Sequence, residues 1–146
     1  MARDLVHPKK TRRSDYLYLF TSKHHGGGTS EDSRWANSIT PDEEFAVFDN
    51  ADWFVIEAES GWLYCVWKED GELHDLGTWA QQIAEFPKPR ANDPWHGYPI
   101  WAINEGAPNN RRGEKMRPTK QVFMKLQTAG LITKRQRKRL WKGDHT

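Results

Sequence analysis

The chain has 146 residues, enough for one domain that buries roughly two-thirds of the surface its unfolded form exposes. Its single cysteine, Cys65, excludes an intramolecular disulfide and a four-cysteine zinc site, and the longest apolar run, residues 16–20, is far shorter than a membrane span. Its aromatic residues (8 Trp, 4 Tyr and 6 Phe) supply the bulky core that disordered chains lack. Without a signal-peptide pattern after Met1, these features predict a soluble, cytoplasmic protein without membrane contact.

The net charge of +2 hides a segregation of charge along the chain. Residues 1–13 hold five Lys and Arg against one acid, residues 14–108 hold five against seventeen, and residues 109–146 hold twelve against two. We therefore expect one domain made of a flexible basic arm (1–13), an acidic α+β body (14–108) and a basic C-terminal segment (109–146). The basic segment either binds a polyanionic partner or lies against the acidic body, and the sequence leaves both open.

The first expected elements are a strand and a short helix. The strand covers residues 16–20, whose Tyr-Leu-Tyr-Leu-Phe run is rich in β-forming residues. The helix is expected to start with Thr40 as its cap, Pro41 at its first position and acids in its first turn. Asp49 and Asn50 are then expected to form a turn.

A β-hairpin is the clearest pattern in the middle of the chain. Apolar segments 53–56 and 62–67 flank a connection that ends in Gly61, and a second turn followed by residues 73–76 extends the hairpin to a meander. Thr78 is expected to cap a helix in which Trp79, Ile83 and Phe86 share one stripe. Strands followed by helices, without regular alternation, predict an α+β fold with a small antiparallel sheet.

The stretch from Pro87 to Pro118 holds six of the eight prolines, so we expect little regular structure there. Trp95 and Trp101 lie within it. They either pin an irregular loop across the core or belong to a binding loop.

Two helices are expected at the C-terminus. Pro118 opens the first, Gly130 ends it, and Thr133 and Gln136 have the capping-box spacing for a second helix over 134–142. The apolar stripe of the first helix consists of Val122, Phe123, Leu126 and Ala129. Together they predict a basic helical hairpin.

The segment Lys125-Leu126-Gln127-Thr128-Ala129-Gly130-Leu131-Ile132-Thr133 resembles the corner of the short bacterial helical hairpin of the SHOCT family. The resemblance covers about a fifth of the chain and implies a helical hairpin there. The second helix of that family tends to be acidic near its start, whereas this one is basic.

The charge of the last helix favours a polyanionic partner. Five of the six residues 134–139 are cationic, and we expect them to surround the helix. Cations in a first helical turn cost roughly 0.3–1 kcal/mol each, so stability alone would not select them, whereas phosphates would. A DNA-reading helix-turn-helix fits poorly, because Gln136 stands where a buried aliphatic is needed. The expected phosphate-binding residues are Arg111, Arg112, Lys115, Arg117, Lys134, Arg135, Lys138 and Arg139.

Enzymatic patterns are weak. The sequence has no HExxH motif and no glycine-rich phosphate loop, and Cys65 lies in an apolar run typical of a core residue. The best catalytic set is that of a metal-free ribonuclease: His96, Tyr98, Arg111 and Arg112. No cofactor and no metal are expected.

The sequence therefore favours a non-enzymatic protein whose basic hairpin contacts nucleic-acid phosphates without reading their sequence. The alternative is a protein–protein adaptor or regulator whose acidic body binds a basic partner, and the third hypothesis is the ribonuclease. The sequence does not specify the partner, DNA or RNA, or the oligomeric state.

Overall fold

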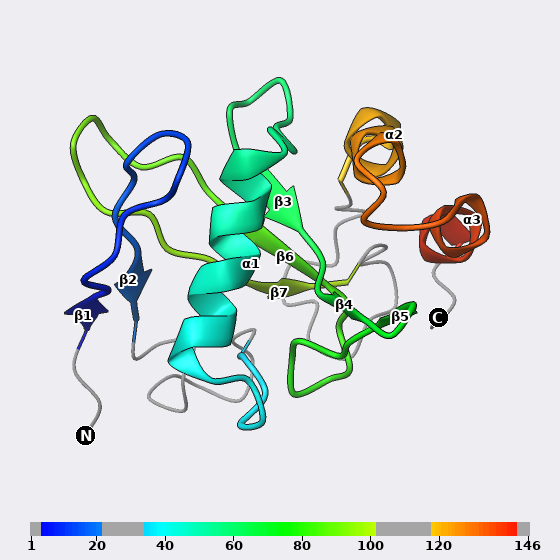
Figure 1. Cartoon of the computed structure of the whole chain (residues 1–146), viewed down its shortest axis with the longest axis horizontal. Coiled ribbons are helices and arrows are strands. Elements are labelled where there is room, and N and C mark those ends of the chain that lie inside the picture. The colour runs from blue at the N-terminus through cyan, green and yellow to red at the C-terminus, as the bar shows by residue number, and fades with distance from the viewer. Residues whose placement is uncertain (1–3, 22–33, 102–117, 143–146) are drawn as a thin grey trace, which may run out of the picture.

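A computed structural model describes residues 4–21, 34–101 and 118–142. It has the expected mixed α+β architecture, with three helices and several small antiparallel sheets in the described residues (Figure 1). The elements follow one another in this order: β1 (Leu5–Val6), β2 (Leu19–Phe20), α1 (Pro41–Trp53), β3 (Leu63–Cys65), β4 (Lys68–Glu69), β5 (Glu72–Leu73), β6 (Ile83–Phe86), β7 (Tyr98–Ile100), α2 (Lys120–Thr128) and α3 (Lys134–Lys142).

The central sheet has the strand order β3-β6-β7, and both strand pairs are antiparallel. Because successive side chains point to opposite faces of a strand, the sheet divides the core in two. Leu63 and Cys65 pack with α1 on one face, whereas Tyr64 and Ile83 pack with α2 and α3 on the other. In Figure 1, α1 crosses the front of the sheet and the α2–α3 hairpin lies to its right. The sheet is therefore covered on both faces.

Helix α1 starts as the sequence predicts. The hydroxyl of Thr40 accepts a hydrogen bond from the backbone N–H of Glu43, and the Glu43 carboxylate accepts one from the backbone N–H of Thr40. The prediction of a turn at Asp49–Asn50 is wrong, because both residues lie inside the helix. Phe45, Phe48 and Ala51 continue at helical spacing into the core, and this packing outweighs the turn preference of Asp49 and Asn50.

The predicted hairpin is largely replaced by other pairings. Residue 53 ends α1, and β3 pairs with β6. Only a short remnant joins the two predicted strands, where the N–H of Tyr64 donates to the carbonyl of Ile56 at 2.9 Å. Gly61 does take the left-handed conformation expected of the connection, with φ of 86°. The second predicted turn is present between β4 and β5.

The predicted helix over 79–86 is wrong, because residues 83–86 form β6, the central strand. The helical spacing of Trp79, Ile83 and Phe86 is coincidental. All four residues of β6 are buried, since helices cover both faces of the sheet, so the strand lacks the alternating pattern that would have revealed it.

Trp95 pins the proline-rich stretch to the core. Its side chain is buried, its N–H donates to the carbonyl of Leu17 at 2.8 Å, and its carbonyl accepts from the N–H of Leu19 at 2.6 Å. The expected strand over 16–20 is thus shorter than predicted, with only Leu19–Phe20 in β2. None of the helices in the described ranges is long and apolar enough to cross a membrane.

Candidate nucleic-acid interface

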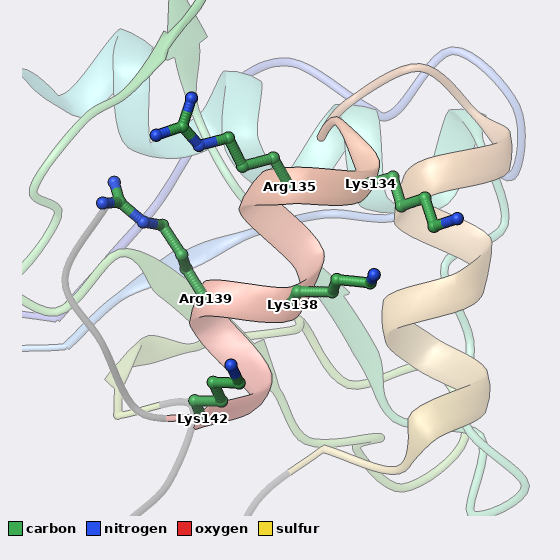
Figure 2. Close-up of a pocket in the computed structure, with 5 residues that line it drawn as sticks. All are labelled: Lys134, Arg135, Lys138, Arg139 and Lys142. Atoms are coloured by element: carbon green, nitrogen blue, oxygen red, sulfur yellow. The ribbon is translucent and has the colours of Figure 1, made fainter.

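The α2–α3 hairpin is built by the local signals that the sequence carries. Gly130 takes φ of 78° at the corner. The hydroxyl of Thr133 accepts from the N–H of Gln136 at 3.0 Å, and the amide oxygen of Gln136 accepts from the N–H of Thr133 at 2.8 Å. The predicted helix end and capping box are confirmed. These local interactions fix where α3 begins, and the two helices run side by side in opposite directions (Figure 2).

The inner face of α3 holds it to the rest of the molecule. Leu140 is buried in the core, and Trp141 meets Phe123 edge to face, with ring centroids 5.6 Å apart. The guanidinium of Arg137 donates to the amide oxygen of Gln127 at 2.6 Å, and the amide of Gln136 donates to the carbonyl of Gly71 at 3.1 Å. Apolar packing and hydrogen bonds to uncharged acceptors thus attach α3 to the rest of the molecule.

The outer face of α3 carries five cations. With 3.6 residues per turn, their positions fall within an arc of about 140°. All five side chains are exposed and line a shallow, open depression (Figure 2). The expectation that the charges surround the helix is therefore wrong, because the cations gather on one face and Arg137 alone turns inward. The outer-face residues are Lys134, Arg135, Lys138, Arg139 and Lys142.

Two rows make up this outer face. Lys134, Lys138 and Lys142 follow one another four residues apart, and Arg135 and Arg139 do the same beside them. In Figure 2 the two arginines extend to one side of α3, and Lys134 and Lys138 extend to the other. Lys142 was not among the phosphate-binding residues predicted from the sequence, although its spacing of four residues from Lys138 placed it in the same row.

No acid neutralises the outer face within the part of the chain that the structure describes. Across residues 4–21, 34–101 and 118–142, none of the five cations forms an ion pair or a side-chain hydrogen bond. Like charges four residues apart on this helix repel one another, and Lys134 and Arg135 also meet the positive end of its dipole. Within the described residues, the charges on this face therefore have no contact that would stabilise the fold.

The N-terminal basic residues behave differently. The side-chain Nε of Arg12 donates to Asp49 at 2.5 Å, and its guanidinium lies 4.6 Å from the centre of the Trp53 ring. Arg13 donates to the buried carboxylate of Asp52 at 3.2 Å. A flexible arm was expected for residues 1–13, and the described part of it contacts α1 through these bonds. Intramolecular neutralisation thus takes place at this end of the chain.

The ribonuclease-like set is only partly described. The hydroxyl of Tyr98 donates a hydrogen bond to the carboxylate of Glu85 at 2.8 Å. His96, two residues earlier in the sequence, is half-buried. Arg111 and Arg112 lie outside the described residues, as do Lys115 and Arg117 of the phosphate-binding set. The described residues therefore do not assemble this catalytic set.

A buried Tyr–Glu–Tyr cluster crosses the sheet. Tyr64, Glu85 and Tyr98 stand opposite one another on β3, β6 and β7, and each tyrosine donates to one Glu85 oxygen at 2.8 Å. Burial, and then the Glu85 charge, raise the pKa of Tyr64 far above its usual value, so its hydroxyl stays a donor. No sequence pattern indicates this cluster, because the register between distant strands aligns its members.

Metal and thiol chemistry find no support in the described ranges. No group of three or more His, Cys, Asp or Glu side chains there could hold a metal ion. Cys65 is fully buried, and burial raises the pKa of its thiol to about 12, which leaves it protonated. Its interpretation as a core residue is confirmed.

Comparisons of the chain with protein-family models, with curated proteins and with solved structures give no match. The resemblance of the hairpin corner to the SHOCT family is therefore not supported by a family model. The function has to be argued from the site itself.

Proposed function

We propose that the protein binds nucleic-acid phosphates through the outer face of α3, without reading base sequence. The observation that carries the proposal is the gathering of five exposed cations on one helix face without an acidic partner among the described residues. Binding of a polyanion offsets the repulsion among these cations, and it is favoured because each neutralised phosphate releases counterions. The binding residues are Lys134, Arg135, Lys138, Arg139 and Lys142.

The side-chain inventory of α3 favours phosphate contact over base reading. Gln136 is the one amide side chain of this helix, and it is held by Thr133 and Gly71. Amide side chains are the usual readers of adenine, whereas lysine and arginine, which can also contact guanine, bind the phosphate of any nucleotide. The outer face therefore suits contact with the backbone.

The same helix is poorly suited to a lipid surface. Amphipathic helices bind membranes by burying an apolar face among the lipid tails. On α3 this face is occupied, since Leu140 lies in the protein core and Trp141 packs against Phe123. The outer face of α3 thus offers charge to a partner, with Trp141 partly exposed beside it.

The test is a variant with Lys134, Arg135, Lys138 and Arg139 changed to Gln. Nucleic-acid affinity should fall, and the slope of log K against log salt should flatten by roughly 0.7–0.9 for each lost phosphate contact. The melting temperature should stay equal or rise, because like charges near a helix start do not stabilise it. Fluorescence anisotropy and thermal unfolding measure the two effects on one sample.

A matched control removes four exposed cations elsewhere. Changing Lys9, Lys10, Lys88 and Arg90 to Gln lowers the net charge equally, and affinity should change far less than in the α3 variant. If the wild type binds no nucleic acid at about 50 mM salt, where phosphate contacts are strong, the proposal is wrong. The adaptor hypothesis would then be tested by affinity purification of a basic protein partner.

A further inference from the structure

We infer that Trp141 is a base-stacking residue of the same site, and that the ligand of the α3 outer face is a single-stranded nucleic acid. The inference rests on the proposed phosphate-binding function and adds to it one residue and the class of ligand. It is carried by the partial exposure of Trp141, by its position beside two lysines and by its support from Phe123.

The side chain of Trp141 is shared between the protein and the solvent. Its ring meets Phe123 edge to face, with an angle of 85° between the two planes, yet 36% of the residue stays exposed. Leu140, the preceding residue, is buried in the core and already anchors α3. Packing therefore uses only part of the indole and leaves apolar surface beside the cations.

Helical geometry places Trp141 at the edge of the cationic face. With 3.6 residues per turn, its position lies about 20° around the helix from Lys134 and about 60° from Lys138. Figure 2 shows that both lysines extend from α3 on the side of α2, the helix that carries Phe123. Trp141 and these two lysines therefore share one edge of α3.

Phe123 gives the ring of Trp141 a rigid support. Phe123 is fully buried on α2, so the ring that it contacts is held in place before a ligand arrives. A tryptophan side chain has few torsions to fix, and one that is already held loses little conformational entropy on binding. The ring is thus prepared for a flat partner.

An aromatic ring beside cations suits a strand with unpaired bases. In proteins that bind single strands, bases stack on aromatic rings while the backbone follows the positive charges, and both contacts tolerate any base. In a duplex the faces of the bases are covered by their neighbours, so a protein ring reaches one only after unstacking. In this arrangement a base lies on Trp141, and Lys134 and Lys138 meet the adjacent phosphates.

The experiment compares ligands with and without accessible bases by isothermal titration calorimetry. The single strands are thymidine and uridine oligonucleotides of about 12 nucleotides, a length within the usual range of site sizes. The other ligands are inorganic polyphosphate, which has no bases, and the thymidine strand annealed to its complement. The wild type should bind the single strands more tightly than the duplex, and the tighter of the two strands identifies DNA or RNA as the source.

The decisive variant is Trp141→Leu. It should weaken binding of both single strands about tenfold, which corresponds to about 1.4 kcal/mol and lies within the range measured for base stacking. Binding of polyphosphate should stay unchanged, since the cations are intact. The slope of log K against log salt should also stay the same, because stacking releases no counterions.

Two controls separate stacking from a structural role of the ring. Trp141→Phe keeps an aromatic ring next to Phe123 and should retain most of the affinity for single strands. Trp53→Leu removes an exposed tryptophan from α1, which packs on the opposite face of the sheet, and should leave that affinity unchanged.

Three results would overturn the inference and leave the proposed function standing. The first is a Trp141→Leu variant that binds the single strands as tightly as the wild type. The second is an equal loss of polyphosphate binding in this variant, which would mean that Trp141 only holds α3 in place. The third is a wild type that binds the duplex more tightly than the strands. If the wild type binds neither the strands nor the duplex, the proposed function itself is refuted.

Discussion

The two ends of this chain are both basic, yet the structure uses their charges in opposite ways. At the N-terminal end Arg12 and Arg13 reach carboxylates of α1, and Arg12 also covers the face of Trp53. At the C-terminal end the five outer cations of α3 meet no acid within the described ranges. A basic segment therefore needs an external partner only where the fold brings it no internal one.

What separates the two ends is the element beside each. Residues 12–14 lie against the polar face of α1, which presents Asp49, Asn50 and Asp52. Helix α3 instead turns its uncharged residues and Arg137 towards the body and directs its other cations outwards. Within the described residues, the fold thus pairs Arg12 and Arg13 with acids and leaves the outer cations of α3 without one.

The largest expected effect comes from removing the acceptor of the N-terminal arm. Asp52 is buried and accepts from the N–H of Ser14 at 3.0 Å, from its hydroxyl at 2.7 Å and from Arg13. Asp52→Ala leaves these donors without an acceptor, so the free energy of unfolding should fall by about 3 kcal/mol. Urea denaturation measures it.

The control for this variant is Asp93→Ala, which removes an exposed carboxylate. It should change the free energy of unfolding by less than about 0.5 kcal/mol. Equal stabilities of the two variants would mean that the arm contributes nothing to the fold, and the contrast between the two basic ends would disappear.

A smaller effect is expected where α3 is held by its cap. Thr133→Ala removes a hydroxyl that accepts from the N–H of Gln136, and an N-cap of this kind contributes about 1 kcal/mol. Amide exchange across residues 134–142 should accelerate. Unchanged protection would show that packing of Leu140 alone fixes the start of α3.

Thr119 offers a matched control for the cap. It is the N-cap residue of α2, but its side chain makes no capping hydrogen bond. Thr119→Ala should therefore leave exchange in α2 nearly unchanged. The pair of variants separates the loss of a capping bond from the mere replacement of threonine.

Capping signals in the sequence were reliable, whereas elements that depend on pairing between distant segments were not predicted. Thr40 was predicted as the cap of α1 and Thr133 with Gln136 as a capping box, and both caps are present. The helix expected at 79–86 failed because β6 is defined by its neighbours β3 and β7, which lie distant in the chain. Burial on both faces removed the alternation by which a strand is recognised.

The candidate site followed the same division. Helical periodicity places the five outer cations on one face of α3, although the charges were expected from the sequence to surround the helix. Whether an acid would meet that charged face depends on contacts between segments far apart, such as the bond between Gln136 and Gly71. No periodicity within α3 reports on those contacts.

The smallest expected effect concerns the acidic turn beside α3. The bond from Gln136 to the carbonyl of Gly71 places the turn between β4 and β5 next to the helix, and Asp70 and Glu72 in it are exposed. Glu69 of the same turn is paired with His74 at 2.8 Å. Asp70 and Glu72 make no ion pair with α3, yet their charge opposes that of an approaching phosphate.

Changing Asp70 to Asn and Glu72 to Gln should therefore raise nucleic-acid affinity about two- to threefold at low salt, and the gain should shrink as salt screens the charges. The fold should tolerate the change, because asparagine before Gly71 suits the left-handed backbone of Asp70, with φ of 52°. Asp15→Asn with Asp93→Asn removes equal charge from exposed sites elsewhere and should give a smaller gain. If both double variants bind equally well, Asp70 and Glu72 act only through the net charge of the protein. Their position beside α3 would then have no effect of its own on binding.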